Sequence, residues 1–521
     1  MADSTIVFLV LAGVVVLFVS NLVPVEIVAV GTALALWATG VLTINEALAG
    51  FGDPTVVYIA SLFIVSEALD ATGVTAWAGQ QLVARAGSSD RRLLVLMMLL
   101  CAVVTALISV NGAVAALLPV VVVTAVRMRQ SPSRLLLPLA FAAHAGSMLA
   151  LTGSPVNVIV SEASKDAGGD YFGFFEYTLA GVPLLAGTVA IVVLFGKRLL
   201  PDRTPRYISD DFSDHARTLV THYELVDDAS EPLYSRRSGV AEVVIPPRSG
   251  LVGDSVFPGM VTDSGDLVVV AVQRNGEHLS RETVVAPGDT LLLRGSWDAL
   301  STHLDDPDVL VVDFPQQVRR QAVPFGPGAK RATVILVGMV ALLATGAVPP
   351  AVASLLAAGA LVLTRVVTLE QSYRAISWTT VVLVAGMIPL STAMGVSGAA
   401  DKLADRLVSM VGDAGAYPLL IGLFVLTAVL GQLISNTATI LVVIPIALAA
   451  AAELDVSSRP VLMSVNVCAS AALLTPVATP ANMMVMGPGG YRFGDYAKLG
   501  LPLLVWYFVV AIGIVPLIWP L

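Results

Sequence analysis

The amino-acid sequence predicts a polytopic α-helical membrane protein that contains two copies of one unit, with a small α/β domain inserted between them. Three observations lead to this prediction. The 521 residues are 56% hydrophobic and 13% charged, with a mean hydropathy of +0.84, which is more apolar surface than a soluble chain of this length could bury. The polar interruptions of its long apolar runs recur about 325 residues later, and a polar stretch, residues 204–330, separates the two sets.

Paired motifs indicate the duplication. Residues 43–57 (TINEALAGFGDPTVV) resemble residues 368–382 (TLEQSYRAISWTTVV). The later pairs keep this spacing to within one residue: Gly73 and Gly398, Ser109 and Ser435, Pro119 and Pro445, Asn157 and Asn482. We therefore expect residues 1–203 and 331–521 to form two inverted membrane repeats, an arrangement typical of secondary transporters with a binding site at the repeat interface.

The longest apolar run of each expected repeat is interrupted near its middle. Residues 93–126 are interrupted by Ser109-Val110-Asn111-Gly112, and residues 416–452 by Ser435-Asn436-Thr437-Ala438-Thr439. Arms of about 15 residues, at ~1.5 Å per residue, fall short of a ~30 Å hydrocarbon core. The sequence thus predicts two re-entrant hairpins whose polar tips meet near the midplane of the membrane. Two complete spans with a polar kink are the alternative.

The charges that flank these runs predict the side from which each hairpin enters. The first run is flanked by Arg91, Arg92, Arg127, Arg129 and Arg134, and the second by Asp413, Glu453 and Asp455, with Arg459 beyond them. Because arginine and lysine concentrate on the cytoplasmic side, the first hairpin is expected to enter from the cytoplasm and the second from the opposite face.

A second interruption follows each hairpin, within residues 135–160 and 459–487. Both contain proline, hydroxyl and asparagine residues inside apolar helices: Thr152, Gly153, Pro155, Asn157, Ala478, Thr479, Pro480 and Asn482. Proline frees a carbonyl of the preceding turn to bind a cation, while hydroxyl and amide groups can hold an oxyanion. The helix N-termini after each break add partial positive charge. Since single motifs of this kind usually serve packing, the pairing between halves carries the prediction of a binding site.

The segment ISNTATILVVIP (434–445) resembles the Ser-Asn-Thr hairpin signature of the divalent anion/sodium symporter family, and LTPVATPANMMVMG (474–487) resembles the unwound helix that follows it. The resemblance covers both membrane halves. It implies sodium-coupled symport of sulfate, a dicarboxylate or citrate by a homodimer, in which a transport domain moves against a scaffold domain. In the first half the motif reads Ser109-Val110-Asn111, so Asn111 and Gly112 would replace the missing asparagine.

The resemblance also implies roles for individual residues. The residues expected to bind the anion are Ser109, Asn111, Ser435, Asn436, Thr437, Thr479 and Pro480. Those expected to bind sodium ions are Ser109, Asn111, Gly112, Gly153, Asn436, Ala478 and Thr479. The supporting residues are Thr152, Pro155, Asn157, Thr439 and Asn482.

The polar insert has the pattern of a small sheet domain. Strand-like stretches occur at 241–245, 267–272, 290–293 and 309–312, with a hairpin signal at Asn275-Gly276. The segments EVVIP (242–246), SGLVG (249–253), VAVQRNG (270–276) and PGDTLL (287–292) resemble the C-terminal module of domains that regulate potassium conductance, preceded by a helical linker at 214–225. This implies a regulatory domain with a small-molecule ligand; an inert spacer is the alternative. Lys197 and Arg198 precede the insert, and Lys330 and Arg331 follow it, so it is expected in the cytoplasm.

The sequence disfavours other classes of protein. With a net charge of −9 and no basic stripe, nucleic acid is not an expected partner. The two cysteines, Cys101 and Cys468, lie in apolar segments, so no disulfide framework is expected. The polar interruptions contain no catalytic nucleophile paired with a general base, so an enzyme is not expected, and neither is an organic cofactor. The N-terminus lacks a signal-peptide pattern, so its first apolar run is expected to remain as a span of the plasma membrane.

Three transport mechanisms stay open beside sodium symport. A proton-coupled anion transporter is one, and a cation/proton or arsenite antiporter is another, although an antiporter needs a titratable acid and neither hairpin tip contains one. A ligand-gated channel is the third, but no TVGYG-type filter is present. His144, within an apolar helix, is more easily explained as a hydrogen-bonded packing residue than as a proton carrier.

Overall fold

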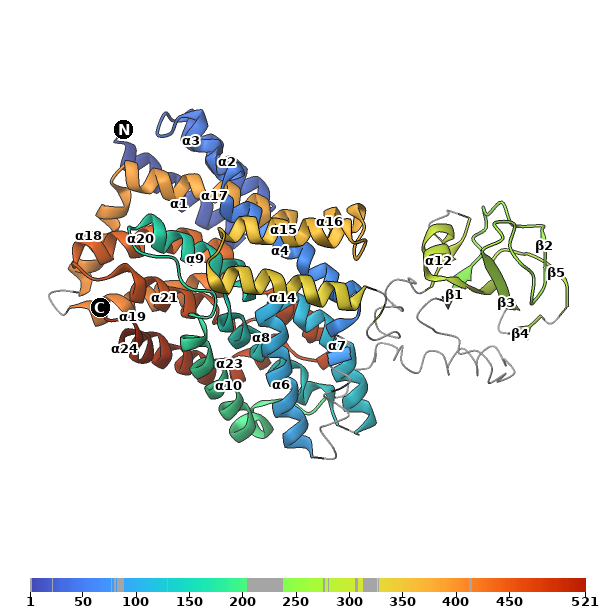
Figure 1. The fold of residues 1–521 in the computed structure, drawn as a ribbon. Helices are drawn as coiled ribbons and strands as arrows, with labels where there is room; N and C mark the ends of the chain where they lie inside the picture. The colour runs from blue at the N-terminus through green and yellow to red at the C-terminus, as the bar shows by residue number, and fades with distance from the viewer. Residues whose placement is uncertain are drawn as a thin grey trace. The chain divides into compact units, whose positions relative to one another are not determined.

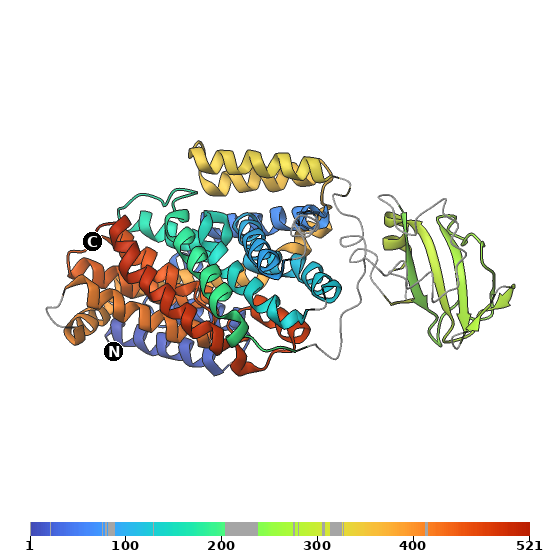
Figure 2. The same cartoon turned by 90° about the horizontal axis from the view of Figure 1, so that it is seen from below.

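The computed structural model describes residues 2–20, 22–75, 77–78, 81, 89–128, 130–203, 238–274, 277–279, 281–304, 308–312, 326, 328–411 and 415–521. The chain divides into two compact units. The helical unit comprises Met1–Leu69, Ala78–Ile208 and Arg331–Leu521, and the sheet unit comprises Asp70–Trp77 and Ser209–Lys330. Figures 1 and 2 show the helices of the first unit and the strands of the second.

The described helices of the helical unit fall into two series, one before the strands and one after them in the sequence. The first series is α1 (Asp3–Ser20), α2 (Val25–Ala38), α3 (Ile44–Leu48), α4 (Pro54–Ala71), α6 (Asp90–Leu107), α7 (Val110–Arg127), α8 (Leu136–Gly146), α9 (Pro155–Asp166) and α10 (Thr178–Leu199). The second series is α14 (Ala329–Thr345), α15 (Pro350–Leu363), α16 (Leu369–Ala375), α17 (Trp378–Val396), α18 (Ala399–Val411), α19 (Ala416–Leu433), α20 (Asn436–Glu453), α21 (Ser458–Ala469), α22 (Pro480–Gly489), α23 (Phe493–Val509) and α24 (Val515–Ile518).

Seven helical segments of the described chain are long and apolar enough to cross a membrane. They are Asp3–Ser20, Ile44–Ala71, Thr178–Leu199, Trp378–Val396, Ala416–Leu433, Asn436–Glu453 and Phe493–Ile518. Each offers at least 18 residues, or ~27 Å of helix at ~1.5 Å per residue, which suits a ~30 Å hydrocarbon core. The expected multi-pass helical membrane protein is confirmed at this level.

Local structure recurs at matching positions of the two series. Thr43 caps α3 and Thr368 caps α16, and each forms a capping box with the acid or amide three residues later. Figure 1 shows α2 beside α17, two helices that pack closely in the helical unit. A side chain at Gly386 would come within 2.7 Å of the Ala29 carbonyl carbon, so this approach requires glycine.

The two long apolar runs form helix pairs whose arms are longer than the sequence predicts. Ile108 and Ser109 separate α6 from α7, and Ile434 and Ser435 separate α19 from α20. Each of the four helices has 18 residues instead of about 15. In the first pair, α6 starts at Asp90 and continues through Arg91 and Arg92 beyond the apolar run, because arginine is a good helix former and an acid is favoured in the first turn of a helix. Helix length therefore does not decide between re-entrant hairpins and full spans. That the helix pairs re-enter, and from which face of the membrane each does so, stay predictions. Two of the flanking charges on which the predicted faces rest, Arg129 and Asp413, lie outside the described residues.

In its described residues, the sheet unit forms one five-stranded antiparallel sheet, a two-stranded ribbon and a short helix. Its elements are β1 (Ser238–Val244), β2 (Ser255–Val256), β3 (Leu267–Arg274), β4 (Glu277–His278), β5 (Thr283–Val284), β6 (Thr290–Ser296), α12 (Trp297–His303) and β7 (Leu310–Val311). The strand order is β4-β3-β6-β1-β7, with β2 paired to β5. The four stretches with strand patterns overlap β1, β3, β6 and β7, and β1, β3 and β6 extend beyond the predicted bounds. Asn275-Gly276, between the paired strands β3 and β4, and the linker 214–225 lie outside the described residues.

The core of the sheet unit forms between the sheet and α12. Val243, Leu293 and Trp297 are among its buried side chains. One buried carboxylate, Asp289, is paired with Arg274 at 2.7 Å. Burial alone would raise the pKa of Asp289, but hydrogen bonds from Arg274 and from the Ala286 backbone outweigh it and hold this pKa below its ordinary value. The ion pair therefore joins β3 to the turn before β6.

Candidate functional site

In the first series, the break between α6 and α7 lies against the break between α8 and α9. The chain leaves regular helix after Gly146 and forms short 3₁₀ turns before α9 starts at Pro155. Within this interruption, the Thr152 hydroxyl donates a 2.6 Å hydrogen bond to the carbonyl of Ala106, near the end of α6. The hydroxyl thus joins the two polar interruptions of this half.

In the second series, a glutamine makes the corresponding connection. Gln432, one residue before the end of α19, donates to the carbonyl of Ala471 at 3.1 Å and accepts from the Leu474 N–H at 3.0 Å. Both partners lie in the irregular segment between α21 and α22. Sequence reasoning missed Gln432, because it lies in the apolar arm of the run and its counterpart in the first half is Ala106.

Two predicted site serines cap the helices that follow the first breaks. Ser109 Oγ accepts the Gly112 N–H at 3.2 Å at the start of α7, and Ser435 Oγ accepts the Ala438 N–H at 3.3 Å at the start of α20. Each cap satisfies one of the free N–H groups of a helix N-terminus. The remaining N–H groups keep their partial positive charge beside the break, which favours an anion there.

Asn157 and Asn482 organise the two irregular segments in the same way. The Asn157 amide donates to the carbonyls of Ser147 and Ala150, at 2.8 and 2.9 Å. The Asn482 amide donates to the carbonyls of Ala472 and Thr475, at 2.8 and 3.0 Å. The backbone carbonyl of each asparagine accepts a hydrogen bond from a tyrosine hydroxyl: Tyr177 donates to Asn157, and Tyr496 donates to Asn482. The amides thus replace the helical hydrogen bonds that these carbonyls lose at the interruption.

The acceptor oxygens of these two asparagines connect the two halves of the chain. Asn466, on α21, donates to Asn157 Oδ1 at 3.0 Å. His144 Nε2, on α8, lies 3.1 Å from Asn482 Oδ1 and 3.3 Å from Thr479 Oγ1. Because the Asn482 amide nitrogen already donates twice, its oxygen is the acceptor and His144 Nε2 carries the proton. His144 therefore has the hydrogen-bonded packing role that the sequence favours.

Glycines allow the irregular segments to approach neighbouring backbone. A side chain at Gly153 would overlap the Ser147 carbonyl within the first segment. On the helices that pack against the segments, a side chain at Gly181 would overlap the Met148 carbonyl, and one at Gly500 the Leu473 carbonyl. The last two contacts occupy matching positions in the two series, so both interruptions are held by closely packed backbone.

Two side-chain oxygens at the interruptions of the second series have no partner among the described residues. Asn436 Oδ1, in the first turn of α20, is buried without a hydrogen bond, as is Thr475 Oγ1 in the irregular segment before α22. A buried polar atom without a partner costs about 1–3 kcal/mol, so such atoms need an explanation. Neutral oxygens of this kind suit a hard, weakly held cation such as sodium.

The remaining predicted site residues differ in accessibility. Asn111, Ser435 and Pro480 are exposed, while Gly112 and Thr437 are partly buried. Thr152, Gly153, Asn157, Thr439, Ala478, Thr479 and Asn482 are buried, and Pro155 is partly buried. Thr439 Oγ1 donates back to the Ser435 carbonyl at 3.0 Å. Among the described residues, no hydrogen bond joins the Ser109 tip to the Ser435 tip.

A pocket of about 130 Å³ lies beside this region, lined by residues of α4, α9, α17 and α20 and by the residue before α4. It contains the carboxylates of Asp53, Glu162 and Asp166 and none of the predicted anion-binding residues. Since three carboxylates would repel an anion, this pocket does not suit the expected substrate.

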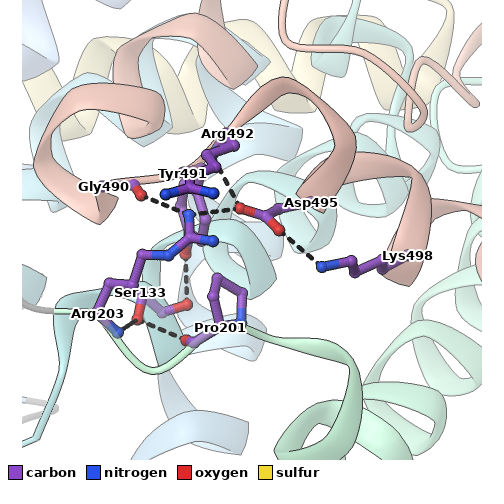
Figure 3. Close-up of polar contacts among 8 residues, drawn as sticks. All are labelled: Ser133, Pro201, Arg203, Gly490, Tyr491, Arg492, Asp495 and Lys498. Atoms are coloured by element: carbon purple, nitrogen blue, oxygen red, sulfur yellow. Dashed lines mark hydrogen bonds and ion pairs between the residues drawn. The ribbon is translucent and has the colours of Figure 1, made fainter.

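A polar cluster ties the end of the first series to the second (Figure 3). Arg203 donates to Asp495 at 2.7 Å and to the Gly490 carbonyl at 3.0 Å. Ser133, just before α8, accepts the Arg203 N–H at 3.0 Å and donates to the Pro201 carbonyl at 2.7 Å. The hydroxyl of Tyr491 donates to the Ser133 carbonyl and accepts the Leu137 N–H. The chain is thus anchored to both interrupted helices immediately before residue 204, where the insert begins.

Comparison with known proteins gives the class. The family model described as citrate transporter matches residues 15–417 and 390–520 of the chain. The chain belongs to the citrate transporter family. It is 33% identical to an uncharacterized transporter of Escherichia coli, YfbS, over 98% of both chains. It is thus a membrane transporter and not an enzyme, and the expected ion-transporter superfamily is confirmed.

Two more distant similarities accompany this assignment. The chain is 27% identical to a probable sodium/sulfate cotransporter 3 of Chlamydomonas reinhardtii, over 56% of this chain and 33% of that protein. The crystal structure of the YdaH transporter of Alcanivorax borkumensis is similar with a TM-score of 0.47 and 14% identity, over 94% of this chain and 89% of the other.

Proposed function

We propose that this member of the citrate transporter family is a secondary active transporter that carries a small divalent anion together with sodium by alternating access. The observation that carries the proposal is the pair of joined interruptions in each half. Each pair brings a capped helix N-terminus next to an irregular segment with displaced carbonyls. Helix N-termini attract an anion, whereas displaced carbonyls and unpartnered side-chain oxygens attract a cation.

The cation in this proposal is sodium, carried as cargo. Asn436 Oδ1 and Thr475 Oγ1 are buried oxygens without a partner among the described residues, and the carbonyls near Ala478 and Thr479 lie in the same irregular segment. None of the residues of either tip is an acid, which disfavours direct proton coupling at these positions. A relative named as a probable sodium/sulfate cotransporter adds support for sodium at low identity.

The anion would bind between the two tips through hydroxyl, amide and backbone N–H groups. The proposed hydrogen-bonding contacts are Ser109, Asn111, Ser435, Asn436, Thr437 and Thr479. Pro480 would contact the anion only through its ring, because proline has no N–H to donate. No arginine or lysine occurs in either tip, so binding relies on neutral donors and helix N-termini, which suit sulfate, a dicarboxylate or citrate alike. The side-chain hydrogen bonds that recur about 325 residues apart support the inverted repeat that alternating access uses.

We further propose a homodimer in the plasma membrane, with the sheet unit as a cytoplasmic regulatory module that binds a small molecule. The support is the order of its segments, which resembles a ligand-binding module, and the basic residues at both junctions. A ligand of this module can change transport only if it binds the two transport states with different affinity.

Uptake into proteoliposomes tests the proposed coupling. Labelled sulfate, succinate and citrate are offered with an inward sodium gradient, or with potassium in its place, at constant pH. We expect at least one anion to accumulate only with sodium. Replacement of Asn436 by Ala should raise the half-saturating sodium concentration about 10- to 100-fold, because a polar ligand of a charged partner contributes about 1.5–3 kcal/mol.

Leu433→Ala is the matched control, because Leu433 lies beside the same tip with 54% of its surface exposed. This variant should keep the parent's sodium dependence. If every anion is taken up equally in sodium-free buffer, sodium coupling is rejected. If uptake instead follows an imposed proton gradient, the transporter is coupled to protons.

A further inference from the structure

A second pocket lies at the opposite end of α6 from the Ser109 tip. Its volume is about 70 Å³, and it is lined by residues of the first turns of α6, the segment before α8 and the last turns of α10. The polar side chains in its lining are Asp90, Arg91, Gln130, Arg134 and Lys197. No residue of the proposed anion and sodium sites contributes to it.

The lining offers hydrogen-bond donors that the protein leaves unused. Arg91 and Lys197 form no ion pair with any residue in the described part of the chain. Gln130 Nε2 is buried and has no acceptor among those residues. A buried amide nitrogen without an acceptor is costly, and an acceptor from outside the protein would satisfy it. Three cationic side chains against one acid, Asp90, give the pocket a net positive charge.

The third cation, Arg134, has an internal partner that an anion could replace. It pairs with Asp202 at 2.6 Å, and the two side chains are 43% and 59% exposed. Exposed ion pairs are weak, typically about 0–1 kcal/mol. Arg134 can therefore turn from Asp202 toward an anion in the pocket at small cost.

The position and size of the pocket restrict its ligand. Lys197 lies at the end of α10, a candidate span, and Leu194 and Phe195 just before it are exposed apolar side chains. This places the pocket at the boundary between apolar and aqueous surroundings. With about 70 Å³ it is smaller than the roughly 300 Å³ that a drug-sized metabolite needs, but it admits a single tetrahedral anion.

We propose that this pocket binds a phosphate group, as carried by the headgroup of an anionic phospholipid or by free phosphate. Arg91 and Lys197 supply the charge, Gln130 donates a hydrogen bond, and Arg134 exchanges Asp202 for the phosphate. Leu194 and Phe195, the exposed apolar side chains on the same turn of α10 as Lys197, favour the phospholipid as the source, because acyl chains can lie along them.

Thermal stability of the full-length protein in detergent tests the proposal. The protein is titrated with phosphatidylglycerol in mixed micelles, with phosphatidylcholine as the neutral lipid and with inorganic phosphate as the soluble probe. We expect saturable stabilisation by phosphatidylglycerol. The R91A/K197A double variant should need about 30-fold more of it, since a basic residue near an anionic surface contributes about 1 kcal/mol.

Two further variants separate site binding from general charge and from misfolding. R92A/R198A removes the same charge from the neighbouring positions, which do not line the pocket, and should leave the titration unchanged. D202N frees Arg134 and should lower the half-saturating concentration several-fold, an effect that loss of folding cannot produce. The proposal is overturned if R92A/R198A and R91A/K197A act alike, or if neither phosphatidylglycerol nor phosphate stabilises the parent. Stabilisation by phosphate alone, lost in R91A/K197A, supports the site with free phosphate as the ligand.

Discussion

At the residue scale, two asparagines hold the interrupted helices together. Asn157 and Asn482 each use both amide hydrogens on carbonyls of their own irregular segment and their oxygen on a donor from the other half. Every polar atom of these side chains has a partner, in a region where unpaired groups are costly. These hydrogen bonds favour the supporting role that the sequence predicts for both asparagines over direct binding of a ligand.

Replacement of Asn482 by Ala tests this role. The change leaves the carbonyls of Ala472 and Thr475 without their donor, and it leaves the ring N–H of His144 with only the longer contact to Thr479 Oγ1. Each orphaned buried group costs about 1–3 kcal/mol, so the melting temperature in detergent should fall by several degrees. Met483→Ala, a change at a 52% exposed neighbour on the same helix, should melt like the parent. An Asn482→Ala protein that melts with the parent would show that the network does not stabilise the segment.

The sequence predicts these asparagines but not their partners. Asn157 and Asn482 stand out because they recur at a fixed spacing beside prolines. His144 and Asn466 lie more than 300 residues along the chain from the groups they bind, and neither has a counterpart of the same type in the other half. Only the packing of one half against the other brings these groups together, and no local pattern encodes that packing.

At the scale of elements, the site depends on helices that stop and restart. The prolines at the starts of α9 and α22 and the Ser109 and Ser435 caps mark these restarts in the sequence. The interruptions were therefore predictable, whereas the lengths of the arms were not, because α6 continues through charged residues beyond its apolar run. The close packing of α10 and α23 against the interruptions could not be predicted from the sequence either. It depends on glycines, and nothing in the sequence distinguishes them from other glycines within helices.

A pair of glycine substitutions on α23 tests this packing. Gly500→Ala places a methyl group against the Leu473 carbonyl, whereas Gly494→Ala meets no atom within 4 Å. Overpacking of this kind typically costs about 1–3 kcal/mol. We expect Gly500→Ala to lower both the melting temperature and the rate of anion uptake, and Gly494→Ala to change neither. Equal behaviour of the two variants would mean that the interruption tolerates displacement of its backbone.

At the scale of the whole molecule, hydropathy and duplication predict a two-part membrane unit with an insert. The structure describes a helical unit and a sheet unit, and the family comparison identifies a transporter. The connection between insert and membrane unit was not predictable. Arg203 and Ser133 bind groups near α22 and α8, so the residues just before the insert touch both interrupted helices.

Replacement of residues 206–326 by a flexible Gly/Ser linker tests the role of the insert. Because Arg203 and the predicted binding residues remain, we expect the shortened protein to stay folded and to bind its anion, with an altered transport rate. The measurements are size-exclusion chromatography, anion binding and proteoliposome uptake. A monodisperse protein that no longer binds the anion would place part of the binding site in the insert.

Linkage between the two ligands tests the central claim most directly. If the joined interruptions bind sodium and the anion together, each ligand must strengthen the binding of the other by the same factor. Anion affinity of the purified protein is measured by calorimetry at increasing sodium, with potassium keeping the ionic strength constant, and sodium affinity is measured with and without the anion. We predict that the anion binds at least tenfold more tightly at saturating sodium and that sodium shows the reciprocal gain. An anion affinity that is the same in sodium and in potassium would contradict the coupled site.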